Sequence, residues 1–271
     1  MSNLPSLSDW KPTREALHTY SRILGEIRRL LSKPHPLWWH VSLQVVSEGL
    51  STGPLALGSG SAEISLNLES HEAVIHAANS QEERIPLGAD LSGAELAEYC
   101  IAALKPGGEI EGLAGADFDD PSPRQSDPEA ARRFHTALRG VQTAFVEAQA
   151  RICGDCSPIQ IWPHHFDLSF EWLATHAPTS DTDASSEEGR CQIGFGFSPG
   201  DNGHEEPYFY ANPWPFDLTL TELPLPGSAR WHVEGWKGSL LTYAEVQSAG
   251  ENLLLDYLTA VYSAAAPRFG D

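Results

Sequence analysis

The sequence predicts an α+β protein made of two pseudo-symmetric helix–strands–helix units, each a mainly antiparallel sheet with helices packed on one face. Three observations predict this class. Apolar residues recur at helical spacing near the start of each half, apolar and polar residues alternate after each helix, and several motifs recur in the same order. Hydrophobic residues at 41% and charged residues at 20% are typical of a folded globular protein.

The first half begins with a helix expected over residues 12–31, where apolar residues form one stripe before two prolines. Residues 37–46 alternate in polarity with period two, which indicates a strand. Two more strands are expected over residues 64–68 and 73–77. A helix over residues 92–104 precedes a Pro-Gly-Gly sequence that ends it.

The middle of the chain is expected to be a linker. Residues 107–127 are rich in Gly, Pro, Asp and Ser and contain few large apolar side chains. We therefore divide the chain into a first repeat unit (1–106), this linker loop (107–127) and a second repeat unit (128–271). We expect the two units to form one compact domain.

The second half repeats the pattern of the first. Asp127-Pro128 is a good helix start, because the aspartate can cap the helix and proline suits its first turn. Strands are expected over residues 159–172 and 191–197 and at residues 208–210, and a final helix over residues 244–265.

Superposing the two halves pairs specific sequences. Residues 39–43 align with residues 164–168, and their in-facing and out-facing positions stay in phase. Ile64, Leu66 and Leu68 align with Ile193, Phe195 and Phe197. This alignment makes His40 and His165 equivalent positions about a pseudo-two-fold axis.

The charge of the chain bears on its partners and its compartment. Lys and Arg number 17 against 37 Asp and Glu, a formal net charge of −20, which repels nucleic acid and anionic membrane surfaces. No apolar run approaches the ~20 residues that span a bilayer, the first residues lack an apolar signal core, and the four cysteines suit a reducing compartment. We expect a cytoplasmic protein whose partner is a small molecule or a protein.

His165 and Asp167 are the candidate catalytic residues. On a strand they would project from the same face, where the carboxylate could orient the imidazole for acid–base chemistry. Both could instead bind a divalent metal, with His40 as a third ligand across the pseudo-dyad. An ordinary solvated polar face is the alternative interpretation, and His164 is expected to be a core histidine.

Gly194 and Gly196 mark a candidate ligand site. They would lie on the opposite face from Phe195, and glycine within a strand is tolerated where another group approaches closely. A ligand or an aromatic ring could lie over them, with Tyr208 and Tyr210 lining the pocket. Tight packing of the chain's own Trp and Tyr residues on that surface is equally consistent with the sequence.

Other motifs carry less chemistry. Cys153 and Cys156 have the spacing of a redox or metal motif, but they follow a helix rather than begin one, and no second such pair exists. A loop with Asp201 and His204 could bind a divalent ion, although a solvated acidic loop is the simpler interpretation.

The motifs together resemble those of a known family. Trp38-Trp39-His40-Val41, Cys156-Ser157-Pro158, Phe166-Asp167-Leu168 and Phe197-Ser198-Pro199-Gly200 are similar to those of an uncharacterised family of bacterial proteins, a domain of unknown function. The resemblance covers nearly the whole chain and implies no specific reaction.

Two hypotheses of function follow. In the first, a polar pocket between the repeats, lined by His40, His165, Asp167 and the two tyrosines, binds a small molecule or catalyses a reaction. In the second, the protein is a non-catalytic interaction module with an exposed apolar patch around Trp38, Trp214 or Trp236. The sequence does not determine the ligand, the reaction, whether a metal binds or the oligomeric state. It also does not determine whether Cys153 and Cys156 form a disulfide.

Overall fold

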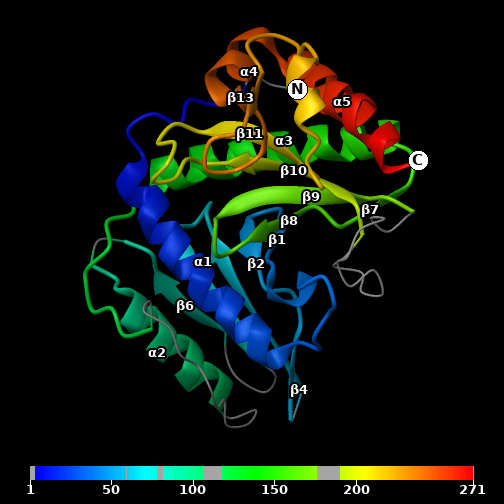
Figure 1. Cartoon of the computed structure of the whole chain (residues 1–271). Helices are drawn as coiled ribbons and strands as arrows, with labels where there is room; N and C mark the ends of the chain where they lie inside the picture. Colours follow the sequence, from blue (N-terminus) through cyan, green and yellow to red (C-terminus); the bar gives the residue numbers. More distant parts are fainter. Residues whose placement is uncertain are drawn as a thin grey trace. The chain divides into compact units, whose positions relative to one another are not determined.

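The computed structural model describes residues 4–58, 60–77, 82–88, 90–105, 118–175 and 190–270. The chain forms two compact units (Figure 1). Unit 1 comprises Met1–Ser6, Leu138–Gln160 and Asp167–Asp271, and unit 2 comprises Leu7–Ala137 and Ile161–Phe166. Helices and two mainly antiparallel sheets confirm the α+β class.

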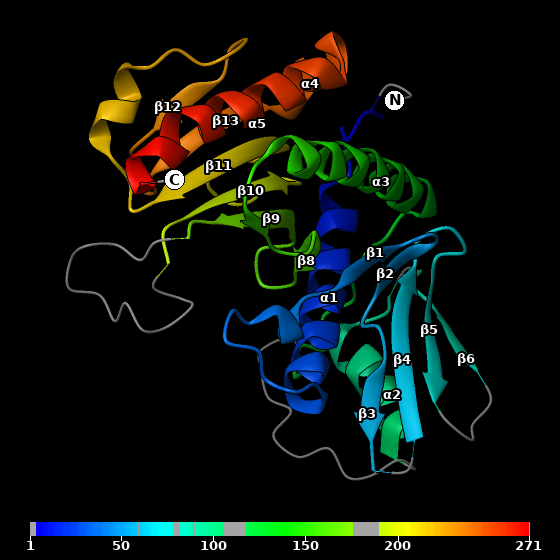
Figure 2. The same cartoon turned by 90° about the vertical axis from the view of Figure 1, so that its right-hand side faces the viewer.

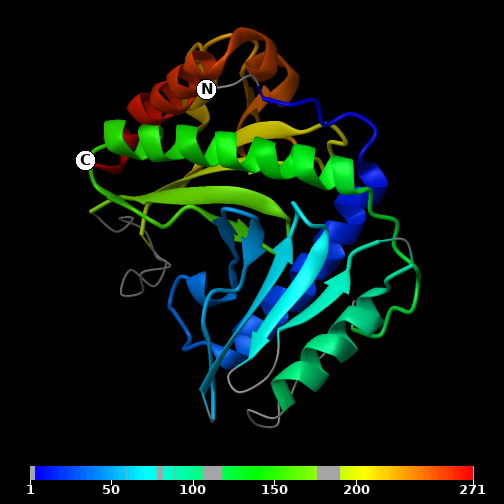
Figure 3. The same cartoon turned by 180° about the vertical axis from the view of Figure 1, so that it is seen from behind.

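Unit 2 contains a sheet with the strand order β1-β2-β4-β5-β6, in which β3 also pairs with β4. Its strands are β1 (Gln44–Val46), β2 (Gly49–Ser51), β3 (Leu55–Leu57), β4 (Gly60–Asn67), β5 (Glu72–Ala77) and β6 (Glu83–Pro86), and its helices are α1 (Lys11–Leu31) and α2 (Gly93–Leu104). Helix α1 contacts β3, β4 and α2, and α2 contacts β5. Figure 3 shows α1 behind β4 and β5.

The helices of unit 2 begin and bury residues as the sequence predicts. Ser92 caps α2 through a capping box with Glu95. Ile23 and Ile27 of α1 are fully buried, as is Ile64 of β4, so the apolar stripe and the apolar strand face form one core.

Unit 1 contains a sheet with the strand order β12-β13-β11-β10-β9-β7 (Figure 2). Its strands are β7 (Asp155–Cys156), β9 (Asp167–Leu173), β10 (Gln192–Ser198), β11 (Tyr208–Trp214), β12 (Arg230–His232) and β13 (Gly238–Thr242), and its helices are α4 (Tyr243–Ala249), α5 (Glu251–Ala265) and the later part of α3 (Pro128–Arg151). Asp127 caps α3, since its Oδ1 accepts the N–H of Ala130 at 2.7 Å.

Helices cover the aromatic face of the unit 1 sheet. Phe145 of α3 packs edge-on against Phe170 of β9, with ring centroids 5.3 Å apart. Tyr243 of α4 packs against Phe197 of β10 at 5.5 Å. Because side chains alternate along a strand, the polar residues of the same strands lie on the other face.

Two predicted strands are interrupted. Residues 37–46 form a 3₁₀ helix (Trp39–Val41) followed only later by β1, and residues 159–172 form β8 (Gln160–Trp162), a turn and β9. The cause is backbone geometry, because Trp38 and Phe166 both adopt a φ near +59° in the left-handed region, which ends an extended chain. The final helix is likewise two helices, broken at Gly250, whose φ is +95°.

The structure does not confirm the pseudo-symmetric repeat. His40 lies in the 3₁₀ helix and His165 in the turn, so neither occupies the strand position on which their equivalence was based. The division into residues 1–106, 107–127 and 128–271 stays a prediction, and residues 107–117 of the linker lie outside the described residues. In the part of the chain that is described, no helix is both long and apolar enough to cross a membrane.

Candidate functional site

The polar face of β9, β10 and β11 in unit 1 gathers the predicted ligand-binding residues. Gly196 pairs with Ser169 on one side and Tyr210 on the other, and Gly194 pairs with Glu171 and Asn212. These cross-strand partners lie on the same side of the sheet, opposite the aromatic face. We call this surface, together with Asp167 at the start of β9, the polar sheet face of unit 1.

Tyr210 is bound to Asp167 across this face. Its hydroxyl group donates a short hydrogen bond to Asp167 Oδ2, and the aspartate is only 5% exposed. The ring of Tyr210 lies over Gly196, where any Cβ atom would overlap ring atoms. An aromatic ring of the chain itself therefore covers Gly196, one of the two alternatives that the sequence left open.

Tyr208 forms a second phenol–carboxylate pair on the same strand. Its hydroxyl donates to Asp201 Oδ2 at 2.8 Å, while Asp201 Oδ1 accepts the N–H groups of Gly203 and His204 at 2.6 and 2.8 Å. The ring of His204 stacks on that of Tyr208, with centroids 4.9 Å apart. Asp201 thus orders its own loop and orients a phenol.

The electrostatics keep both phenols neutral. Burial raises the pKa of Tyr210 well above its ordinary value, and the negative charge of Asp167 raises it further. Burial and then the hydrogen bond to Asp201 raise the pKa of Tyr208 in the same way. Burial alone would raise the pKa of Asp201, but the hydrogen bonds from Tyr208 and from the backbone of His204 and Gly203 outweigh it and lower that pKa. These tyrosines are hydrogen-bond donors, not bases or nucleophiles, near neutral pH.

Gly194 leaves an open position beside the covered Gly196. A Cβ atom built on Gly194 would meet no atom within 4 Å. The cross-strand row of Glu171, Gly194 and Asn212 is partly exposed, and Asn212 Oδ1 is buried without a hydrogen-bond partner among the described residues. A ligand could therefore reach this row and form hydrogen bonds with its polar groups.

Aromatic side chains border the polar sheet face on the β13 side. Trp236 packs edge-on against Tyr210 at 6.4 Å, and His232 packs on Trp236 at 4.4 Å. Glu171, Asn212 and Trp236 were not predicted as site residues. The alternation of strand positions could have identified Glu171 and Asn212, because both lie on the same face of the sheet as the tyrosines.

The predicted histidines belong to unit 2. His165 is exposed in the turn that precedes β9, so the expectation that it projects beside Asp167 from one strand face is wrong. His164 is exposed in the same turn and is not a core histidine. His40 accepts the N–H of His35 through Nδ1 at 3.2 Å and stacks on Trp38.

The metal hypothesis gains no support from the described geometry. Within the described ranges, no group of three or more His, Cys, Asp or Glu side chains is arranged to hold a metal ion. Cys153 and Cys156 are free thiols, the first exposed and the second partly buried. Burial and the neighbouring Asp155 raise the pKa of Cys156 to about 11.

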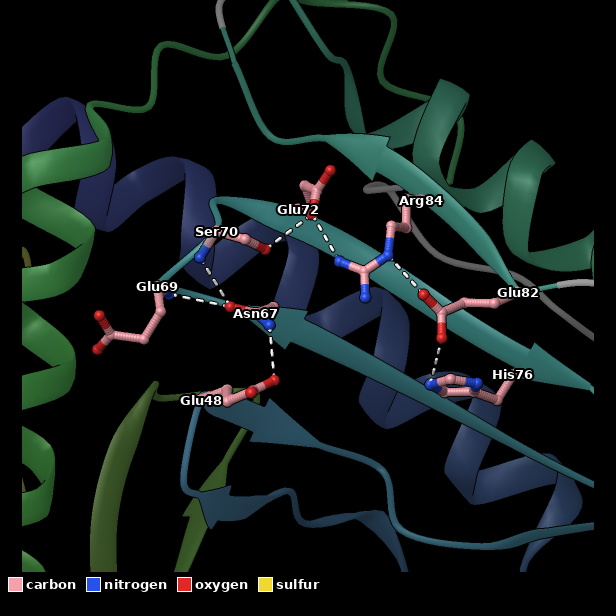
Figure 4. A network of polar contacts seen from close by, with 8 residues as sticks. All are labelled: Glu48, Asn67, Glu69, Ser70, Glu72, His76, Glu82 and Arg84. Carbon is pink, nitrogen blue, oxygen red and sulfur yellow. Dashed lines mark hydrogen bonds and ion pairs between the residues drawn. The ribbon is translucent and has the colours of Figure 1, made fainter.

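The sheet of unit 2 has a polar face of a different kind (Figure 4). Arg84 pairs with Glu72 at 2.8 Å and with Glu82 at 2.5 Å, and Glu82 also reaches His76 at 3.3 Å. Asn67 donates to Glu48 at 2.8 Å. Asn67 is buried, but the ion pairs of Arg84 are exposed and resemble an ordinary solvated surface.

One comparison with known proteins finds a match. A family model described as "Family of unknown function (DUF5996)" matches residues 2–270. No curated protein and no solved structure matches the chain.

Proposed function

The chain belongs to this family of unknown function, and we propose that it binds a small molecule on the polar sheet face of unit 1. The observation that carries the proposal is the contrast between two neighbouring glycines. Gly196 is filled by the ring of Tyr210, whereas Gly194 is open between Glu171 and Asn212. A strand glycine that no side chain of the described residues covers suits the close approach of a ligand.

The chemistry of the face favours a ligand with hydrogen-bond donors and no negative charge. Both phenol hydroxyl groups already donate to carboxylates, whereas Asn212 Oδ1 is an acceptor without a hydrogen-bond partner among the described residues and can receive a donor of the ligand. Glu171 and Asp167 would repel an anion at short range. The ring of Tyr210 supplies an apolar wall, which suits a ligand with both a ring and a polar donor.

The tyrosine–aspartate pairs act in this proposal as positioning groups. The hydrogen bond from Tyr210 holds Asp167 in one orientation and keeps the ring over Gly196, which shapes the edge of the open position. A catalytic role for Asp167 or His165 stays a prediction, because binding is what the open glycine supports directly.

A matched set of three probes tests the proposal by NMR titration of the full chain. Benzylammonium and benzyl alcohol should shift the resonances of Gly194 and Tyr210, and benzoate should not, because it carries the wrong charge. Gly194→Leu should abolish the shifts by filling the open position. Gly88→Leu is the control, since Gly88 in unit 2 also has no atom within 4 Å of a built Cβ. Unchanged binding in Gly194→Leu, or no binding of any probe, would refute the proposal.

The second hypothesis, a non-catalytic interaction module, is favoured by a separate observation. Trp38 is 53% exposed and Trp214 is 39% exposed, so both indole rings present apolar surface to solvent. A binding surface at Trp38 is compatible with a ligand site in unit 1.

A further inference from the structure

The segment that leads from the end of α1 to β1 differs in charge from the rest of the chain. Residues 27–47 contain Arg28, Arg29 and Lys33 and no Asp or Glu, in a protein with a formal charge of −20. Glu26 pairs with Arg29 at 2.6 Å, and Lys33 is exposed. The segment is therefore a local cationic region on an acidic protein.

Exposed indole surface lies in the same segment. Trp38 is 53% exposed, and Pro36, two residues before it, is also exposed. Its backbone has a φ of +59°, which is uncommon for a bulky residue and costs roughly 1–2 kcal/mol. A strained residue that presents a large apolar side chain to solvent is a candidate for a binding role.

Two histidines hold this loop, residues 34–39, which we call the Trp38 loop. His35 Nδ1 accepts the N–H of Leu37 at 3.1 Å, and His40 Nδ1 accepts the N–H of His35 at 3.2 Å. A nitrogen that accepts a hydrogen bond carries no proton, so both contacts require neutral imidazoles. Arg28 also donates to the carbonyl of His40 at 3.0 Å, which ties the loop to α1.

The surroundings of His40 are cationic. Burial lowers its pKa, and the guanidinium group of Arg28, the imidazole of His35 and the guanidinium group of Arg29 lower the pKa further. The loop is therefore pre-organised near neutral pH in a field that attracts negative charge.

We propose that the Trp38 loop is a docking surface for a short acidic segment of a partner protein, with the indole of Trp38 as apolar anchor and Lys33 and Arg29 as the cationic rim. Trp and Arg are the residues that most often dominate binding energy at protein interfaces. A long polyanion such as nucleic acid is a poorer fit, because it would run from this small region onto the acidic remainder of the surface. A short acidic peptide engages the cationic region alone.

Fluorescence anisotropy on the full chain tests the proposal with a labelled peptide of alternating Glu and Leu. We expect binding that weakens as salt is added and that exceeds binding of the matching Gln and Leu peptide. Trp38→Ala should weaken binding by at least about tenfold, the usual loss when a central tryptophan anchor is removed. Lys33→Glu should weaken it as well, by reversing a rim charge.

Matched controls lie in the same unit. Tyr99, which is 48% exposed on α2, and Lys105, which is exposed at the end of α2, are of similar type and exposure. Tyr99→Ala and Lys105→Glu should leave the affinity unchanged. Absence of peptide binding, equal binding of the Gln peptide, an equal loss in Tyr99→Ala, or tighter binding of an oligodeoxythymidine would each overturn the proposal.

Discussion

Each unit carries a sheet with helices on one face and polar residues on the other, but the two polar faces are built differently. On unit 1, Tyr210 is bound to the buried Asp167, and Tyr208 is bound to Asp201. On unit 2, Arg84 joins Glu72 and Glu82 in the exposed network of Figure 4. Both faces satisfy the alternation of strands, so alternation alone does not distinguish a candidate site from a solvated surface.

The difference lies in burial and in steric demand. A buried polar group costs free energy when it loses its partner, whereas an exposed ion pair exchanges its partner for water at little cost. The ring of Tyr210 also makes Gly196 obligatory, because a Cβ atom at this position would overlap the ring. Substitutions should therefore separate the two faces by the size of their effects.

The largest effect is expected for Gly196→Ala. The new methyl group would displace the ring of Tyr210 and break its hydrogen bond to Asp167, which should lower the free energy of unfolding by about 3 kcal/mol. Urea denaturation measures the loss. Gly194→Ala is the control, and it should stay within about 0.5 kcal/mol of wild type, because its Cβ would meet no neighbour. Equal losses in both variants would remove the distinction between the two glycines.

Tyr210→Phe should have the next largest effect. It removes the donor to a buried carboxylate and keeps the ring over Gly196, so we expect a loss of about 2 kcal/mol in the free energy of unfolding. The measurement is the denaturation midpoint at neutral pH. A variant as stable as wild type would show that the phenol–carboxylate pair is energetically equivalent to an exposed one.

Tyr208→Phe should cost about 1 kcal/mol, since its acceptor Asp201 is more exposed. The folded-state pKa of Asp201 is lowered, so its stabilising contribution is fully present above its unfolded pKa of about 4 and is lost as pH falls through the folded value. The stability difference between wild type and variant should shrink on acidification below about pH 4. A difference that is constant with pH would mean that the hydroxyl does not act through the ionised carboxylate.

The smallest effect is expected for Arg84→Ala on unit 2. Its pairs with Glu72 and Glu82 are exposed, so the loss in the free energy of unfolding should be smaller than that of Tyr208→Phe and should decrease further with added salt. Thermal denaturation at low and high salt measures it. A loss as large as that of Tyr210→Phe would show that the two polar faces are energetically alike.

Part of the candidate site followed from the sequence and part did not. The alternation around Gly194 and Gly196 placed both glycines on one face, and the two tyrosines, expected only to line a nearby pocket, share that face in the structure. The same reasoning failed for His165 and His40, because a turn and a 3₁₀ helix replace the expected strands. The left-handed backbone at Phe166 is associated with its burial against Phe134, 5.2 Å away, a long-range contact that no local pattern reveals.

The sequence by itself determined the features that depend on neighbouring residues. Asp127 starts its helix where the capping pattern predicts, and the helical stripe of α1 is buried as its spacing requires. Only the tertiary structure decided that Tyr210 meets Asp167, which is 43 residues away, and that its ring covers Gly196 rather than Gly194. Caps and periodicity arise from contacts within a few residues, whereas cross-strand neighbours depend on register and strand order, which long-range packing selects.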